Sequence, residues 1–123
     1  MRKILIAEDD LASRELVQEV LAGWGYEVVA ASDGQDALVK IREAQPDLVL
    51  LDVQMPRLDG YGVVRQLRQE PRFAKLPVVA LTAYAMRGDS EKVLAAGFDA
   101  HISKPIDPLA LKTKIEELLE VRS

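Results

Sequence analysis

The sequence contains no cysteine. This absence excludes a disulfide framework, a zinc site built on thiolates and a cysteine nucleophile. It also suits a reducing compartment, and we expect a cytoplasmic protein. No apolar run approaches the ~18 residues of a membrane-spanning helix, and the first run, which ends before Glu8, is too short for a signal peptide. We therefore expect a soluble protein with no membrane association.

The chain also lacks an excess of basic residues. It has 16 lysines and arginines against 20 aspartates and glutamates, which gives a formal net charge of −4. Proteins that bind nucleic acid present basic patches to the phosphates, so we do not expect nucleic acid as a partner. With 123 residues, 49% of them hydrophobic, and no linker or low-complexity stretch, the chain should form one domain, 1–123, with its own core.

Short apolar runs alternate with helical patterns along the whole chain. After the first run, for example, Val17, Val20, Leu21 and Trp24 recur at helical spacing. Such alternation predicts an α/β fold, a doubly wound (βα)5 parallel sheet with helices on both faces. The five runs are Ile4–Ala7, Glu27–Ala31, Leu48–Leu51, Val78–Leu81 and Ala100–Ile102.

Particular residues mark the expected helix boundaries. Asp10 and Asp33 are suited to cap the first two helices, because short polar side chains can accept hydrogen bonds from the first turn. Gly97 is suited to end the fourth helix, which the pattern places at about residues 87–96. The segment 70–75 is predicted to be a polar loop.

Polar residues stand where the predicted strands end. Asp52 follows the third run directly, Glu8 and Asp9 follow the first, and Lys104 comes shortly after the fifth. Because the carboxyl ends of parallel strands meet at one edge of a sheet, these residues should form one site. Clustered carboxylates need a counter-charge, and hard oxygen ligands suit Mg²⁺. Thr82, after the fourth run, would add a hydroxyl donor.

Each of these residues also has an ordinary interpretation. A single aspartate at a strand end is more often a helix cap or a surface residue, an acidic triplet such as Glu8–Asp10 is usually a solvated helix start, and a lone lysine is usually on the surface. Their combination at strand ends favours chemistry. An aspartate can accept a phosphoryl group as an acyl phosphate, and a metal ion and a lysine would neutralise the charge. We therefore expect a divalent cation beside a reactive Asp52.

Four motifs follow one another along the chain: Ile4–Asp10, Leu50–Pro56 with Asp59-Gly60, Leu81–Ala83 and Ser103–Pro105. With these motifs in this order, the chain resembles the response regulator receiver domains of two-component signalling. The resemblance implies the flavodoxin-like strand order 2-1-3-4-5 and a stand-alone, CheY-like switch without an output domain. Asp52 would accept a phosphoryl group from a sensor histidine kinase or a histidine phosphotransfer protein. The face of Thr82 and His101 would then change its contacts with a downstream protein target, which the sequence does not identify.

The resemblance also assigns individual roles. Thr82 and Lys104 would hold the phosphoryl oxygens, and the peptide bond before Pro105 would be cis. The domain would assist its own phosphorylation and dephosphorylation without being an enzyme in the usual sense. The implied ligands of Mg²⁺, or alternatively of Mn²⁺, are Glu8, Asp9, Asp52 and the backbone carbonyl of Gln54.

Three positions depart from the usual family pattern. His101 stands where tyrosine or phenylalanine is usual, and if it turns inward, its burial would favour the neutral ring and make the output pH-sensitive near neutrality. The alternative is a partly exposed histidine with no switching role. Tyr84 would flank the path of the hydrolysing water, so we predict a long-lived phosphorylated state, unless Tyr84 lies flat on the surface. Glu8 replaces the commoner aspartate, with little change expected in the metal geometry.

Three other functions stay open from the sequence alone. The chain fits a receiver module of a larger hybrid kinase as well as a stand-alone protein. A magnesium-dependent phosphohydrolase with an aspartyl nucleophile would need an acid where Gln54 stands. A flavodoxin-like cofactor binder would need a phosphate-binding loop after the first strand, where Glu8–Asp10 would repel a phosphate.

Overall fold

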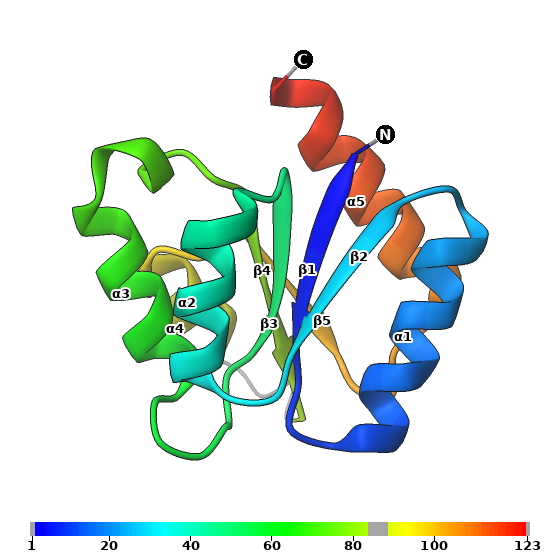
Figure 1. The fold of residues 1–123 in the computed structure, drawn as a ribbon, viewed down its shortest axis with the longest axis horizontal. Coiled ribbons are helices and arrows are strands. Elements are labelled where there is room, and N and C mark those ends of the chain that lie inside the picture. The colour runs from blue at the N-terminus through cyan, green and yellow to red at the C-terminus, as the bar shows by residue number, and fades with distance from the viewer. Residues whose placement is uncertain (1, 84–88, 123) are drawn as a thin grey trace.

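The structure is a computed structural model of the chain and describes residues 2–83 and 89–122. Within these residues, parallel strands form one sheet in the order β2-β1-β3-β4-β5, which confirms the predicted fold class and strand order (Figure 1). The strands are β1 (Lys3–Ala7), β2 (Glu27–Ala31), β3 (Leu48–Asp52), β4 (Val78–Thr82) and β5 (Ala100–Ser103). The helices are α1 (Leu11–Gly23), α2 (Gly34–Ala44), α3 (Gly60–Gln69), the 3-10 helix η1 (Pro71–Phe73), α4 (Asp89–Ala96) and α5 (Pro108–Arg122).

The sheet lies between two layers of helices. Helices α1 and α5 cover one face, and α2, α3 and α4 cover the other (Figure 1). Side chains alternate between these faces along each strand. In β1, Ile4 and Ile6 pack toward α1 and α5, whereas Leu5 and Ala7 pack toward the opposite helices. Every residue of the central strands β3 and β4 is buried, which explains why these segments are continuously apolar up to their last residue.

The predicted boundary residues act as expected. The Asp10 side chain accepts a hydrogen bond from the backbone N–H of Ser13 at 2.9 Å, and Asp33 accepts one from Asp36 at 2.8 Å. Gly97 follows α4 with a φ of 116°, a left-handed conformation that glycine adopts without steric cost. The predicted beginning of α4 lies outside the described residues.

The prediction of a polar loop at residues 70–75 was wrong in part. Pro71–Phe73 form η1, and the Phe73 ring is only 3% exposed, packed in the core on the α2–α3–α4 side of the sheet. The guanidinium of Arg72 lies 4.7 Å from the centre of this ring. A single phenylalanine among polar neighbours gives no periodic pattern, so the sequence did not indicate that it anchors the segment.

Arg68 of α3 fastens the loops at the edge of the sheet where the strands begin. Its side chain is 20% exposed, and its guanidinium donates hydrogen bonds of 2.8–3.3 Å to five acceptors. One arginine thereby provides hydrogen-bond donors to backbone carbonyls at this edge. The acceptors are the backbone carbonyls of Phe73, Ala74, Leu76 and Gly97 and the carboxylate of Asp99.

The beginning of β1 and the end of α5 lie on the same side of the molecule, opposite the carboxyl ends of the strands (Figure 1). None of the helices in the described part of the chain combines the length and the apolar character that crossing a bilayer requires.

Candidate functional site

The carboxyl ends of four neighbouring strands bring the predicted site residues to one edge of the sheet. β1 leads directly into Glu8 and Asp9, β3 ends at Asp52, and β4 ends at Thr82. Lys104 follows the last residue of β5, and the parallel register of β3, β4 and β5 keeps these strand ends level. The residues that the sequence places at different strand ends therefore share one edge, as predicted.

Three carboxylates form a cluster at this edge. One oxygen from each of Glu8, Asp9 and Asp52 lies within 4.8 Å of the other two. Glu8 and Asp52 are buried, 2% and 5% exposed, whereas Asp9 is open to solvent. Like charges this close repel strongly where water is excluded, so the cluster favours a cation. Oxygen donors with an open side fit Mg²⁺, which binds one or two carboxylates and keeps several waters.

Lys104 supplies the positive charge that the buried acids face. Its Nζ donates to Glu8 Oε2 at 2.7 Å and to Asp52 Oδ2 at 2.8 Å. Its backbone N–H donates to the carbonyl of Thr82 at 2.7 Å, which ties the start of the β5–α5 loop to the end of β4. The sequence predicted Lys104 as a ligand of phosphoryl oxygens and did not predict that it joins two of the acids directly.

The charged groups shift one another's pKa. Burial raises the pKa of Glu8 from 4.5 to about 7, and the neighbouring Asp52 adds to the rise, while the hydrogen bond from Lys104 opposes it. Burial alone would lower the pKa of Lys104, but its hydrogen bonds to Asp52 and Glu8 and their charges outweigh burial and raise it. Lys104 therefore stays cationic, and Glu8 holds a proton up to about neutral pH.

The loop after β3 orients the second oxygen of Asp52. The backbone N–H of Gln54 donates to Asp52 Oδ1 at 2.9 Å, and the N–H of Gly60 donates to the carbonyl of Val53 at 3.1 Å. A Cβ on Gly60 would collide with the backbone carbonyl of Asp52, so glycine allows the loop to return this closely. The backbone of Gln54 therefore lies beside Asp52, and its carbonyl as a metal ligand stays a prediction.

The structure bears differently on the other residues that were predicted to belong to the site. Thr82 is buried, 6% exposed, and His101 is half-buried on β5. A switching role for His101 stays a prediction. The bond between Lys104 and Pro105 is cis, which confirms the expectation from the resemblance. Tyr84 lies outside the described residues, so its effect on the hydrolysing water stays a prediction.

Sequence reasoning missed the groups that hold Glu8 in place. Arg14 Nη1 donates to the backbone carbonyl of Glu8 at 2.8 Å, and the N–H of Asp10 donates to Glu8 Oε1 at 3.2 Å. No spacing rule pairs an arginine with a carbonyl six residues earlier, because the contact depends on how the chain turns into α1. The glutamate side chain is thus bound from its own loop as well as by Lys104.

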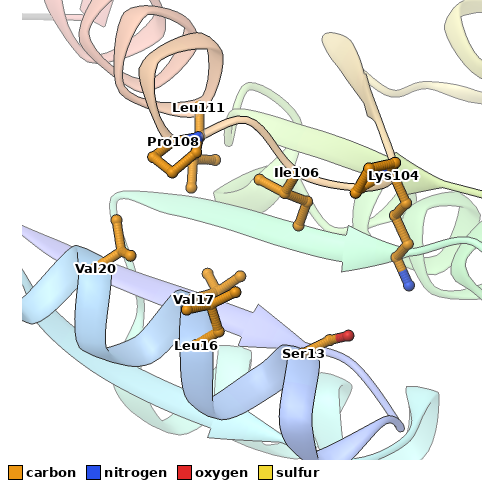
Figure 2. A pocket seen from close by; sticks show the side chains of 9 residues that line it. Ser13, Leu16, Val17, Val20, Lys104, Ile106, Pro108 and Leu111 are labelled. Atoms are coloured by element: carbon orange, nitrogen blue, oxygen red, sulfur yellow. The ribbon is translucent and has the colours of Figure 1, made fainter.

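An apolar hollow beside the site was also not predicted. It lies between α1 and the segment that joins β5 to α5, and Lys104 lies at its edge (Figure 2). Residues from α1, from the β5–α5 segment and from α5 line it, and no sequence pattern indicates that these segments meet around a hollow. Its lining residues are Ser13, Leu16, Val17, Val20, Lys104, Pro105, Ile106, Pro108 and Leu111.

Curated relatives cover nearly the whole chain. It is 41% identical over 118 residues to "Probable transcriptional regulator ycf27" of Cyanophora paradoxa, which covers 96% of this chain but only 48% of that protein. It is 37% identical over 105 residues to the polar-differentiation response regulator DivK of Brucella anthropi, which covers 85% of each. The chain thus spans about half the length of some relatives and most of the length of others.

Solved structures share the fold closely. Chemotaxis protein CheY4 of Vibrio cholerae matches with a TM-score of 0.90 and 30% identity over 96% of this chain and 98% of that one. The receiver domain of a sensor histidine kinase from Pseudomonas aeruginosa PAO1, solved with a magnesium ion in its active site cleft, matches with a TM-score of 0.90 and 30% identity, covering 97% and 98%. The model of the response regulator receiver domain family matches residues 4–116. The chain belongs to the response regulator receiver domain family of two-component systems.

Proposed function

We propose that this receiver domain is a phosphorylation-driven signalling switch in which Asp52 is the phosphoacceptor. The observation that supports this proposal most strongly is the cluster of three carboxylates within 4.8 Å, two of which form ion pairs with Lys104. Both oxygens of Asp52 are fixed, one by Lys104 and the other by the N–H of Gln54. A fixed carboxylate needs little reorganisation before it reacts.

The phosphoryl donor is a phosphohistidine of a sensor histidine kinase or a histidine phosphotransfer protein. An oxygen of Asp52 forms the new bond to phosphorus while the phosphorus–nitrogen bond of the donor breaks, and the donor imidazole leaves with the electron pair. The product on Asp52 is an acyl phosphate. Support comes from family membership and from solved neighbours that are receiver domains of histidine kinases.

Glu8, Asp9 and Asp52 would hold Mg²⁺ together with the backbone carbonyl of Gln54. When bound, the ion neutralises the charge of the acids and of the phosphoryl oxygens. Mn²⁺ prefers the same oxygen donors and would serve as an alternative. The magnesium ion in the related Pseudomonas aeruginosa receiver domain supports this assignment.

Lys104 and Thr82 hold the transferred group. The ammonium of Lys104, which lies 2.8 Å from Asp52 Oδ2, pairs with a phosphoryl oxygen and gives up its contact with Glu8. Thr82 ends the neighbouring strand, and its hydroxyl donates to another phosphoryl oxygen. Contacts on the face of Thr82 and His101 then shift toward a downstream protein, because the phosphate prefers one of two conformations.

Residues 1–123 form one receiver domain in this proposal. The same site serves a stand-alone response regulator and a receiver module of a hybrid kinase, and relatives of both kinds share the fold. A phosphohydrolase is disfavoured, because position 54 holds glutamine instead of the acid that such enzymes use to protonate the leaving group.

Intact-mass measurement after incubation with acetyl phosphate tests the proposal. The protein should gain the mass of one phosphoryl group when Mg²⁺ or Mn²⁺ is present, and EDTA should prevent the gain. Asp52→Asn should remove it, while Asp47→Asn, at an aspartate that precedes the same strand, should leave it unchanged. Phosphorylation of Asp52→Asn to the parent level would overturn the assignment.

A further inference from the structure

The loop from Val53 to Asp59 connects Asp52 to α3 and is held at its tip by residues far from the site. Its first part carries the N–H that Gln54 donates to Asp52 Oδ1. Its tip is a three-residue turn in which the N–H of Leu58 donates to the carbonyl of Pro56 at 2.8 Å. Any change in this turn would therefore be passed along a few backbone bonds to the Asp52 carboxylate.

Arg57 lies at the centre of this turn in a conformation that its side chain disfavours. Its φ is 69°, in the left-handed region, where residues other than glycine are strained. Turns of this three-residue kind with positive φ are rare for the same reason. The strain persists only because something outside the turn holds it in place.

An ion pair between two loops provides that hold. Arg57 Nη1 lies 2.5 Å from Asp33 Oδ2, and the Asp33 side chain is only 8% exposed. The other oxygen of Asp33 caps α2 by accepting the N–H of Asp36. Next to it, a Cβ on Gly34 would collide with the carbonyl oxygen of Leu58, so the backbones of the two loops are in direct contact.

We propose that the ion pair of Asp33 and Arg57 is a positioning device for the metal and phosphoacceptor site. The pair holds Arg57 in its strained turn, and the turn places the backbone of Gln54 against Asp52, where the Gln54 carbonyl would serve as a ligand of the dication. Asp33 and Arg57 act through the loop and touch neither the metal nor the phosphoryl group. This inference rests on the proposed function, because it assigns the pair a role in Mg²⁺ binding.

Because Arg57 has a positive φ, replacing it with alanine and with glycine should have different effects. Arg57→Ala removes the ion pair and keeps the strain, so the turn should relax and Mg²⁺ affinity should fall. Arg57→Gly also removes the ion pair, but glycine adopts positive φ freely, so the turn should persist and affinity should stay near the parent value. Asp33→Asn keeps a good cap for α2 and breaks the pair, so it should behave like Arg57→Ala.

Isothermal titration of the metal-free proteins with Mg²⁺ measures these effects, and the NMR signal of the Gln54 amide reports the turn directly. Arg57→Ala and Asp33→Asn should weaken Mg²⁺ binding by about three- to tenfold, less than groups that hydrogen-bond a metal ligand directly. In the Arg57→Gly background, Asp33→Asn should cause no further loss. The Gln54 amide should shift in Arg57→Ala and Asp33→Asn, but not in Arg57→Gly.

Arg42→Ala is a matched control, because Arg42 of α2 pairs with Glu70 at 2.9 Å at the opposite end of α2 and α3. Its Mg²⁺ affinity should equal that of the parent. Parent affinity in Arg57→Ala, or equal losses in Arg57→Ala and Arg57→Gly, would overturn the positioning role. Absence of Mg²⁺ binding by the parent protein would instead overturn the proposed function itself.

Discussion

Replacing Glu8 with glutamine should make the metal-free protein more stable at alkaline pH. Burial raises the pKa of Glu8 from 4.5 to about 7, so the folded protein holds a proton that the unfolded chain has already released. Each pKa unit corresponds to about 1.4 kcal/mol, so ionising this carboxyl costs the folded state about 3 kcal/mol above neutral pH. Glutamine avoids that cost and can still accept a hydrogen bond from Lys104.

The sign of the effect depends on pH. For a carboxyl with a raised pKa, stability is highest below the unfolded pKa and falls as pH rises from 4.5 to about 7. The Glu8→Gln variant should therefore match the parent at about pH 4 and exceed its unfolding free energy by about 3 kcal/mol at about pH 8. With Mg²⁺ present the difference in unfolding free energy between the variant and the parent should become smaller, because the ion stabilises the ionised parent more than the variant.

Urea denaturation in EDTA, followed by the fluorescence of Trp24, measures the difference. Trp24 is the chain's single tryptophan, half-buried against the core between the sheet and α1 and α5, and it lies at the end of α1 away from the site. Glu15→Gln, at an exposed position of α1, is the control and should change stability by less than about 0.5 kcal/mol at either pH. If Glu8→Gln kept the pH slope of the parent, the raised pKa would be refuted as the cause.

Two further predictions concern packing. Arg68→Ala should lower the unfolding free energy by about 3 kcal/mol, because several carbonyls lose a charged donor at once. Arg65→Ala, at an exposed position of the same helix, is the control and should have little effect in the same denaturation assay. Gly34→Ala should cost about 2 kcal/mol, because the new Cβ would push against the carbonyl of Leu58, whereas Gly23→Ala meets nothing within 4 Å and should not lower the thermal midpoint.

The sequence predicts the fold well because local patterns determine it. Short apolar runs such as Leu48–Leu51, alternating with helical patterns, indicate buried parallel strands, and Asp10 and Asp33 cap helices by a local rule. The acidic cluster followed from the same reasoning, because all parallel strands end at one edge. These features need no knowledge of which side chain meets which across the molecule.

Contacts between distant loops were not predictable in this way. The pairing of Lys104 with Glu8 depends on how far each side chain reaches across the strand ends. The pairing of Arg57 with Asp33 depends on a turn in an uncommon conformation. Phe73 was missed because one apolar residue in a polar segment has no periodic signal. For both ion pairs the decisive quantity is a distance between segments far apart in the sequence.

The positions of the two chain ends have a practical consequence. β1 begins and α5 ends on the side of the sheet opposite Asp52 (Figure 1). A fluorescent label, an affinity tag or a linker to a sensor surface attached at either end would therefore project away from the acidic cluster. A tethered molecule should present the acidic edge to a kinase in solution, so binding assays on immobilised protein can use either terminus.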